Sequence, residues 1–321
     1  MPQSGLSPSL NHADVVREVA ASSAPGLSTL AASWRRSLMH FRIDPGATTR
    51  PERIEAKALA ERRDQSADML RVAAPVLDRL GSAVLDAGSA VILSDADGLV
   101  IDERMRLPDV DVFEGAGLVS GADWSEAREG TNAIGTCLAD RQPVEIRYDQ
   151  HFRVRNISLA CTAAPIEAQD GEIAGVIDVS SFRGDVNDMN ARLIALTVQD
   201  AAMRISCALF HAAFPGARIV AVDDNVIGSP CLIAVDGDDL IAGCNRAACR
   251  ALGLSRQEIK RRPPAIDLLG RGGSGGDISA AIRSEITRAL RRAGGNVSAA
   301  ARDLHIGRAT LYRKIKALKL N

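Results

Sequence analysis

The spacing of apolar residues changes at about Ser89, and this change most restricts the folds open to the chain. Over residues 27–85, apolar residues recur at helical spacing on a charged background. From Ser89 the stretch SAVILSDADGLVIDE instead alternates as two strands around an Asp-Ala-Asp-Gly turn. Helices followed by hairpins predict an α+β fold.

The stretches after this hairpin complete a domain of the same class. EGTNAIGTCLAD predicts a short helix, SLACTAAPIEAQDGEIAGVIDVSS predicts a second hairpin, and MNARLIALTVQDAAMRISCALFHAAF predicts a long apolar closing helix. We therefore expect an antiparallel sheet with flanking helices over residues 86–215. A helical region at 27–85 precedes it, and residues 1–26, rich in Ser, Pro and Ala, are expected to form a flexible arm.

A smaller unit and a basic tail follow. CLIAVDGDDLIAGCNRAACRALGLSRQEI predicts strand, turn, strand and helix within residues 216–265, and RGGSGG predicts a flexible linker within 266–276. Residues 277–321 carry ten Lys and Arg against three Asp and Glu, whereas the first 276 residues have a net charge of -8. A basic segment attached to an acidic body often binds phosphate groups. The other interpretation of the charge is a basic face exposed to solvent.

Residues 277–321 have the spacing of three short helices. The first ends at Gly294-Gly295 and has an apolar stripe formed by Ile278, Ile282, Ile286 and Leu290. Asn296 or Ser298 can cap a second helix, SAAARDL, and a tight His-Ile-Gly turn leads to a third, basic helix over 308–318. We predict an all-α helix-turn-helix at the C-terminus.

The third helix has the composition of a recognition helix. It is expected to bury Leu311, Ile315 and Leu318, which leaves its Arg, Lys and Thr side chains free for base edges and phosphate in the major groove. The residues expected at DNA are Asn296, Ser298, Arg308, Thr310, Arg313, Lys314 and Lys316. An amphipathic packing helix is the alternative, but it does not explain a consistently basic exposed face.

The segment GGNVSAAARDLHIGRATLYRKIKALKL resembles the Fis-type helix-turn-helix along its whole length. The resemblance implies that Arg308, Thr310, Arg313 and Lys314 lie on the DNA-facing surface. Gly307 departs from the family, which often has Asn or Ser as a polar cap at this position.

Four segments of the body resemble the sensor half of the acetoin catabolism regulators, which are sigma-54-dependent activators with a GAF domain. They are SWRRSLMHFRIDP, VILSDADGLVI, EGTNAIGTCLADRQPVEI and ACTAAPIEAQDGEIAGVIDVSS, and the likeness runs over about residues 30–215. The resemblance implies a GAF fold there. Residues 216–265 resemble the opening of a PAS domain at about half the usual length, which implies a dimerising spacer.

Those regulators carry a central ATPase with a GxxxxGK[ST] phosphate loop and a GAFTGA-like loop, and neither sequence occurs in the 321 residues. We therefore expect a sequence-specific transcriptional regulator that acts without its own ATPase, by repression or through a housekeeping-type polymerase. The alternative is an interaction protein, an antagonist or adaptor that forms mixed dimers with a full-length ATPase regulator.

The resemblance to GAF domains implies a cavity between the sheet and its helices. Its candidate residues are Trp124, Thr131, Asn132, Cys137, His151 and Cys161. The sequence indicates no effector, and a GAF domain that serves only for dimerisation is the alternative. A redox switch through Cys137, Cys161 or Cys249 is a further alternative, less favoured than buried reduced thiols.

No spacing of residues predicts an enzyme, a cofactor or a metal site. The glycines at 115, 117 and 121 lack the spacing of a dinucleotide loop, and a lone His151 is more often a packed histidine than a metal or haem ligand. The expected partners are double-stranded DNA with a pseudo-palindromic site, a second copy of the chain, and RNA polymerase or a related regulator. With no signal sequence or long apolar span, we expect a cytoplasmic protein without membrane contact.

Overall fold

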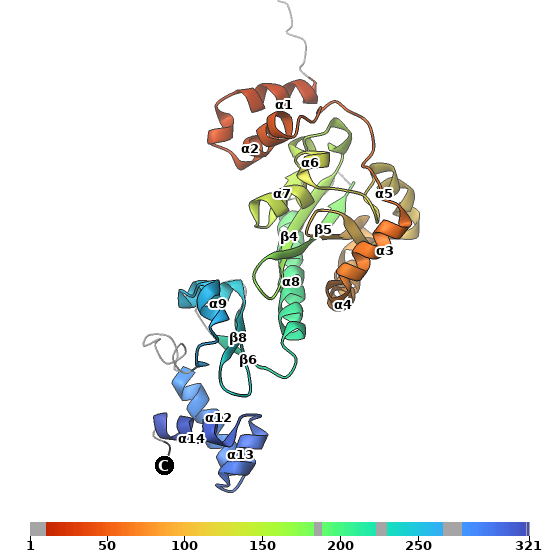
Figure 1. Cartoon of the computed structure of the whole chain (residues 1–321). Helices are drawn as coiled ribbons and strands as arrows, with labels where there is room; N and C mark the ends of the chain where they lie inside the picture. Colours follow the sequence, from red (N-terminus) through yellow and green to blue (C-terminus); the bar gives the residue numbers. More distant parts are fainter. Residues whose placement is uncertain (1–10, 183–187, 223–229, 266–277, 319, 321) are drawn as a thin grey trace, which may run out of the picture. The chain divides into compact units, whose positions relative to one another are not determined.

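The computed structural model describes residues 11–182, 188–222, 230–265, 278–318 and 320 (Figure 1). The chain forms two compact units. The first contains residues 1–167 and 173–206, and the second contains residues 168–172 and 207–321.

The first unit contains a sheet with helices around it. Its α-helices are α1 (His12–Ala21), α2 (Thr29–Arg35), α3 (Ala56–Gln65), α4 (Ala67–Val84), α5 (Val110–Ala116), α6 (Glu126–Glu129), α7 (Ala133–Asp140) and α8 (Asp188–Ala213), which runs on into the second unit. Its short helices are η1 (Ala24–Gly26), η2 (Arg36–His40), η3 (Leu85–Ala87), η4 (Leu107–Asp109), η5 (Tyr148–Gln150) and η6 (Val154–Asn156). Its strands are β1 (Ser89–Asp95), β2 (Val100–Arg104), β3 (Val144–Arg147), β4 (Ala160–Glu167) and β5 (Ile173–Ser181).

The five strands form one antiparallel sheet in the order β2-β1-β5-β4-β3, which confirms the predicted α+β fold class. β5 is the central strand, and Asp178 in its middle lies opposite Ile92 on β1 and Ala163 on β4. Because side chains alternate along a strand, these residues share one face of the sheet. On that face Ile92 and Ala163 join a buried core with Ile134 of α7, so Asp178 lies beneath α7.

The N-terminal region differs from its prediction. Residues 12–21, expected within a flexible arm, form α1, and Asn11 caps this helix by accepting a hydrogen bond from the Asp14 amide. α1 buries Val16 and Ala20 in a cluster with Trp34 and Phe152. The prediction of a flexible arm rested on the Ser- and Ala-rich composition and did not consider that Val16 and Ala20 lie one helical turn apart. Burial of these two apolar residues keeps the segment helical.

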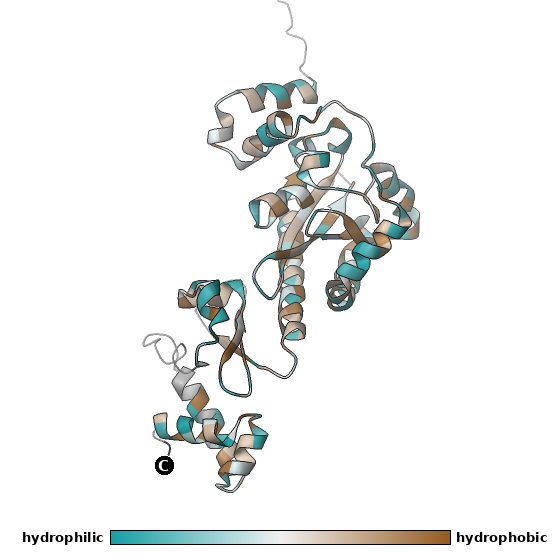
Figure 2. Cartoon of the chain, in the orientation of Figure 1, coloured by the Kyte–Doolittle hydropathy of each residue, from teal (hydrophilic) through white to brown (hydrophobic). Residues whose placement is uncertain are grey.

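Helix α3, unlike α1, has no buried residue, and it is largely hydrophilic in Figure 2. The following α4 buries Met69, Ala73, Leu77 and Leu80. α4 packs on β1 and β2, so it anchors the helical region to the sheet.

The second unit contains the antiparallel strands β6 (Arg218–Val222), β7 (Cys231–Val235) and β8 (Ile241–Cys244), in that order across the sheet. Its helices are α9 (Arg246–Leu252), α10 (Arg256–Lys260), α12 (Ile278–Arg292), α13 (Val297–Asp303) and α14 (Arg308–Ala317). β7 is apolar on both faces. Leu232 and Ala234 pack with Phe210, while Ile233 and Val235 belong to an apolar cluster that also includes residues of α12, α13 and α14. The expected linker at 266–276 lies outside the described residues.

One helix among the described residues is long and apolar enough to cross a bilayer, the segment Asn190–Ala213 of α8. Length and composition are weak grounds for a membrane span, because the core helix of a soluble protein satisfies the same test. Phe210 and Ile205 of this helix are buried in the protein.

Candidate functional site

The C-terminal helices have the cap residues of a helix-turn-helix. α12 ends before Gly294 and Gly295, which both have positive φ, as the sequence predicted. Asn296 caps α13 by accepting a hydrogen bond from the Ala299 amide at 3.1 Å, while Ser298 lies within the helix. α14 begins at Arg308 after Gly307, whose lack of a side chain leaves the helix without a side-chain cap.

The exposed face of α14 is basic. Arg308, Arg313 and Lys316 are exposed, and the Arg308 guanidinium lies 5.6 Å from the centre of the Tyr312 ring. Stacking on an aromatic ring holds an arginine in place at a small cost in side-chain entropy. This face presents three cations from one rigid helix, which suits contacts to phosphate and base edges.

Two residues expected on the free face are instead buried. Thr310 is 5% exposed and Lys314 is 3% exposed. The turn after β7 covers Lys314, whose Nζ lies 2.7 Å from Asp239 Oδ2, and it also bonds to the start of α14, where the Gly307 amide donates to the Gly237 carbonyl at 3.3 Å. The sequence could not indicate this, because the covering turn is some 75 residues distant in the chain.

All six residues predicted for the sensor cavity are buried, and three of them support the local backbone. Trp124 donates to the Gly117 carbonyl at 2.7 Å. Asn132 caps α7, and its amide also donates to the Trp124 and Gly130 carbonyls. Thr131 contacts Ser33, so these positions connect segments of the first unit.

Of the other three predicted residues, His151 and Cys161 are connected to Asp178 through Ser180. The Cys161 Sγ is 3.5 Å from His151 Nε2, and the Ser180 hydroxyl lies 3.1 Å from that sulfur and 2.6 Å from Asp178 Oδ2. Burial raises the pKa of the Cys137 thiol on α7, and the charge of Asp178 adds to this shift. We call His151, Cys161, Ser180 and Asp178 the buried polar row.

Asp178 and Ser180 were not predicted as site residues from the sequence. They follow Val176 at alternate positions of β5, so the period of two that predicted this strand could have placed them on its inner face. The second oxygen of Asp178 has no hydrogen-bond partner among the described residues. Burial raises the pKa of Asp178 to about 7, although the hydrogen bond from Ser180 acts to lower this pKa.

His151 is neutral in this row. Burial lowers its pKa to about 4, although a hydrogen bond to the Tyr148 carbonyl opposes the shift. With its Nδ1 at 3.1 Å from that carbonyl, the ring donates from Nδ1 and accepts at Nε2 from the Cys161 thiol. No group of three or more His, Cys, Asp or Glu residues suited to a metal occurs in the described part of the chain.

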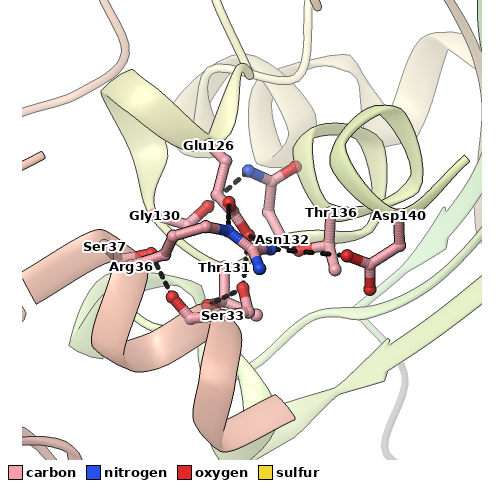
Figure 3. Close-up of polar contacts among 9 residues, drawn as sticks. All are labelled: Ser33, Arg36, Ser37, Glu126, Gly130, Thr131, Asn132, Thr136 and Asp140. Atoms are coloured by element: carbon pink, nitrogen blue, oxygen red, sulfur yellow. Dashed lines mark hydrogen bonds and ion pairs between the residues drawn. The ribbon is translucent and has the colours of Figure 1, made fainter. Parts of the chain in front are cut away.

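A second polar cluster links α2 and η2 with α6 and α7 (Figure 3). Its centre is Glu126, which is 5% exposed. Arg36 donates from Nε to Glu126 Oε2 at 2.6 Å and from Nη2 to Oε1 at 2.9 Å, a bidentate ion pair. Ser33 also donates to Glu126, and its hydroxyl lies 2.6 Å from that of Thr131. We call this group the Glu126 cluster.

The geometry of η2 contributes to the cluster. The amide of Phe41 bonds to the carbonyl of Arg36, five residues earlier, so a π-turn follows α2 directly. Arg36 begins this turn, and Ser37 within it donates to the Ser33 carbonyl at 2.9 Å. Two of the sequence segments that resembled a known family, SWRRS and EGTNAIGT, therefore meet at one carboxylate.

The model of the MimR N-terminal domain matches residues 18–206, more than half of the chain. The chain belongs to the MimR N-terminal domain family. A second model, that of the Fis family of bacterial regulatory proteins, matches residues 283–318, the region of α12 to α14.

Named relatives of this MimR-family chain are transcriptional regulators. The acetoin catabolism regulatory protein of Cupriavidus necator is 33% identical over 150 residues, which are 47% of this chain and 22% of that protein. The acetoin dehydrogenase operon transcriptional activator AcoR of Bacillus subtilis is 33% identical over 155 residues, 47% of this chain and 25% of AcoR. The propane 2-monooxygenase operon transcriptional activator MimR of Mycolicibacterium goodii is 32% identical over 152 residues, 47% of this chain and 25% of MimR. The chain thus spans about a quarter of the length of these relatives.

A solved structure supports the fold of the MimR-family chain. A chain in the crystal structure of the E. coli DhaR(N)-DhaL complex has a TM-score of 0.52 and 15% identity, and the likeness covers 81% of this chain and 85% of that one. The MimR-family chain therefore combines a MimR N-terminal domain with a helix-turn-helix region of the Fis type.

Proposed function

We propose that the protein is a site-specific DNA-binding regulator whose sensor-like domain senses an effector or dimerises the chain, and whose α14 enters the major groove. The observation that carries this proposal is the exposed basic face of α14, made by Arg308, Arg313 and Lys316 on a helix supported by a capped α13. A dimer would place two such helices about 34 Å apart, one turn of B-DNA, on a pseudo-palindromic site.

The sequence between the sensor and the helix-turn-helix supports a proposal about the mode of regulation. The 321 residues contain no GxxxxGK[ST] loop to hold the phosphates of ATP. We propose that the chain acts without its own ATPase, as a repressor or through a housekeeping-type polymerase, in the cytoplasm. We expect no phosphate release when the purified chain is incubated with ATP and DNA.

The effector, if the sensor binds one, is proposed to lie near the buried polar row. His151 and Cys161 were predicted for the cavity, and Asp178 offers them a neighbouring carboxyl with an unused oxygen. A ligand can shift the protein between two DNA-binding states only by its differential affinity for them.

Selection from genomic DNA tests the central proposal. Fragments are recovered with the full chain and with a chain that lacks residues 277–321, in about 150 mM salt, where non-specific binding is weak. We expect enrichment of a few fragments that share a dyad, with the full chain alone. Failure to enrich any fragment would refute the self-sufficient regulator and favour mixed dimers with a longer, ATPase-containing regulator as the function.

Substitutions on α14 separate base contacts from phosphate contacts. Arg313→Ala is expected to weaken the selected site by roughly 1–3 kcal/mol and to relax preference at one position. Lys316→Ala is expected to weaken all sequences alike and to reduce the salt slope by about one. Equal effects of both substitutions on every sequence would contradict Arg313 as a base reader.

A further inference from the structure

Lys314 of α14 has an acidic partner within the protein itself. Its Nζ lies 2.7 Å from Asp239 Oδ2, and the two side chains are 4% and 8% exposed. Burial lowers the pKa of Lys314, and the contact with Asp239 opposes that shift. The surrounding cations of the same helix, Arg308, Arg313 and Lys316, are exposed, so Lys314 differs from them in being covered.

The covering element is a well-defined turn between β7 and β8. The Asp236 carboxylate accepts hydrogen bonds from the amides of Asp238 and Leu240, both at 2.9 Å, and it pairs with Arg262. Asp239 has a positive φ of 64°, which an aspartate tolerates better than most residues. The local bonds of the turn therefore do not depend on α14, and the turn can keep its form when α14 is released.

The contact covers the start of the recognition helix as well as Lys314. The Gly307 amide donates to the Gly237 carbonyl at 3.3 Å, and this amide lies at the N-terminus of α14. Thr310, in the first turn of the helix, is buried at 5% exposure. A helix N-terminus and its first turn are the parts of a recognition helix that approach the duplex.

We propose that the turn 236–239 is an autoinhibitory clasp, in which Asp239 occupies the place of a DNA phosphate at Lys314 and must be displaced when the duplex binds. This inference rests on the DNA-binding function proposed above. A buried ion pair contributes little net stability, because the desolvation of both charges offsets their attraction. Exchange of a carboxylate for a phosphate keeps an anion at Lys314, so the clasp can open at small cost once DNA is present.

The clasp sets the DNA affinity through the population of the open form. If most of the free protein is closed, the apparent affinity falls by the fraction that is open. Loss of the Asp239 charge should therefore tighten DNA binding. Coupling free energies of the usual size correspond to changes of about 5- to 150-fold in binding affinity.

Two charge-matched variants test the clasp. Asp239→Asn removes the negative charge that pairs with Lys314 and also with Arg218, while Asp238→Asn removes the same charge from an exposed neighbour in the same turn. The probe is a mixed-sequence duplex of about 20 base pairs, followed by fluorescence anisotropy at about 50 mM salt, where phosphate contacts dominate. We expect Asp239→Asn to bind at least about fivefold tighter than wild type, and Asp238→Asn to stay within about twofold of it, since a distant exposed charge is screened.

The outcomes separate this inference from the proposed function. Equal affinities for Asp239→Asn and Asp238→Asn, or weaker binding by Asp239→Asn, overturn the clasp and leave DNA binding intact. Failure of all three proteins to bind any duplex overturns both.

Hydrogen exchange on the wild-type chain tests the clasp without any substitution. Addition of the duplex should lower the protection of the Gly307 amide, whose acceptor is the Gly237 carbonyl of the turn, while the rest of α14 gains protection. Unchanged or greater protection of the Gly307 amide in the DNA complex would show that the contact with the turn is kept and that Asp239 is not displaced.

Discussion

Asp178 is a carboxyl group in the middle of a sheet with no cation beside it among the described residues. Only the Ser180 hydroxyl opposes the effect of burial on it, so its pKa rises to about 7. Near neutral pH the folded protein therefore holds this group about half protonated. An uncompensated buried charge costs several kcal/mol, and the proton removes that charge.

This shift gives stability a definite dependence on pH. The folded pKa of about 7 lies above the ordinary 3.8, so the folded state binds the proton more tightly. The free energy of unfolding should fall as pH rises from about 4 to about 7. The substitution Asp178→Asn introduces a neutral isostere. The free energy of unfolding of this variant, relative to that of the wild type, should therefore increase with pH, by a few kcal/mol at most at pH 8.

Urea melts of both proteins from pH 5 to pH 8 measure this difference. His151 has the opposite slope, because its lowered pKa makes the folded state lose stability as pH falls through 6.5 towards 4. That slope is common to both proteins and cancels in the comparison. A difference that does not vary with pH would contradict the shifted Asp178.

The cysteines of the first unit should be poor thiolates. Burial raises the pKa of Cys161 well above its ordinary value and also raises that of Cys137, and the Asp178 charge adds to both shifts. Alkylation of the native chain followed by mass spectrometry should label the half-buried Cys207 and Cys249 first. Faster labelling of Cys161 would favour the redox switch that the sequence left open.

At the scale of elements, the Glu126 cluster fixes α2 and η2 to the helices above the sheet. Glu126 accepts from Arg36, Ser33 and Thr136, so its buried carboxylate has donors from two separate segments. Removal of the cation from a buried ion pair lowers the free energy of unfolding by more than the intact pair had raised it, because the carboxylate is left buried without a partner. The cluster therefore makes docking of α2 conditional on a few specific contacts.

Adjacent arginines allow a matched test of this docking. Arg36→Ala removes the ion pair and should lower the free energy of unfolding by about 1–3 kcal/mol, a range reduced because Arg36 is about a third exposed. Arg35→Ala removes an exposed charge and should change stability by less than about 0.5 kcal/mol. Equal losses measured by urea unfolding would contradict a specific role for the cluster.

The elements that the sequence predicted are those with a strong local pattern. The Asp-Ala-Asp-Gly turn placed β1 and β2, and Gly294 and Gly295 placed the end of α12. β3 and β6 were missed, because four or five half-buried residues do not alternate strongly enough to stand out. The roles of Glu126, Asp178 and Asp239 depend on partners distant in the chain, which no local pattern encodes.

For the whole molecule, the proposed function gives different roles to the basic charge of residues 277–321 and to the acidic charge of the remainder. The tail binds phosphate in the proposed function, while the net negative body discourages collapse onto the duplex elsewhere. A dimer would concentrate contact at two places on the DNA.

Footprinting tests this arrangement. On a selected fragment, the full chain should protect two half-sites whose centres are about 10.5 base pairs, or a multiple of this, apart. Sedimentation of the complex should give two chains per duplex. Protection of a single half-site by one chain would contradict the dimer.

The Glu126 cluster also restricts how such regulators can exchange parts in evolution. Since Arg36 and Ser33 complete the bonds of a glutamate 90 or more residues later, a gene fusion that began at the sheet would inherit an unpaired carboxylate. The segment that recombination can move intact begins before α2, and the family match, from residue 18, starts on that side of the boundary.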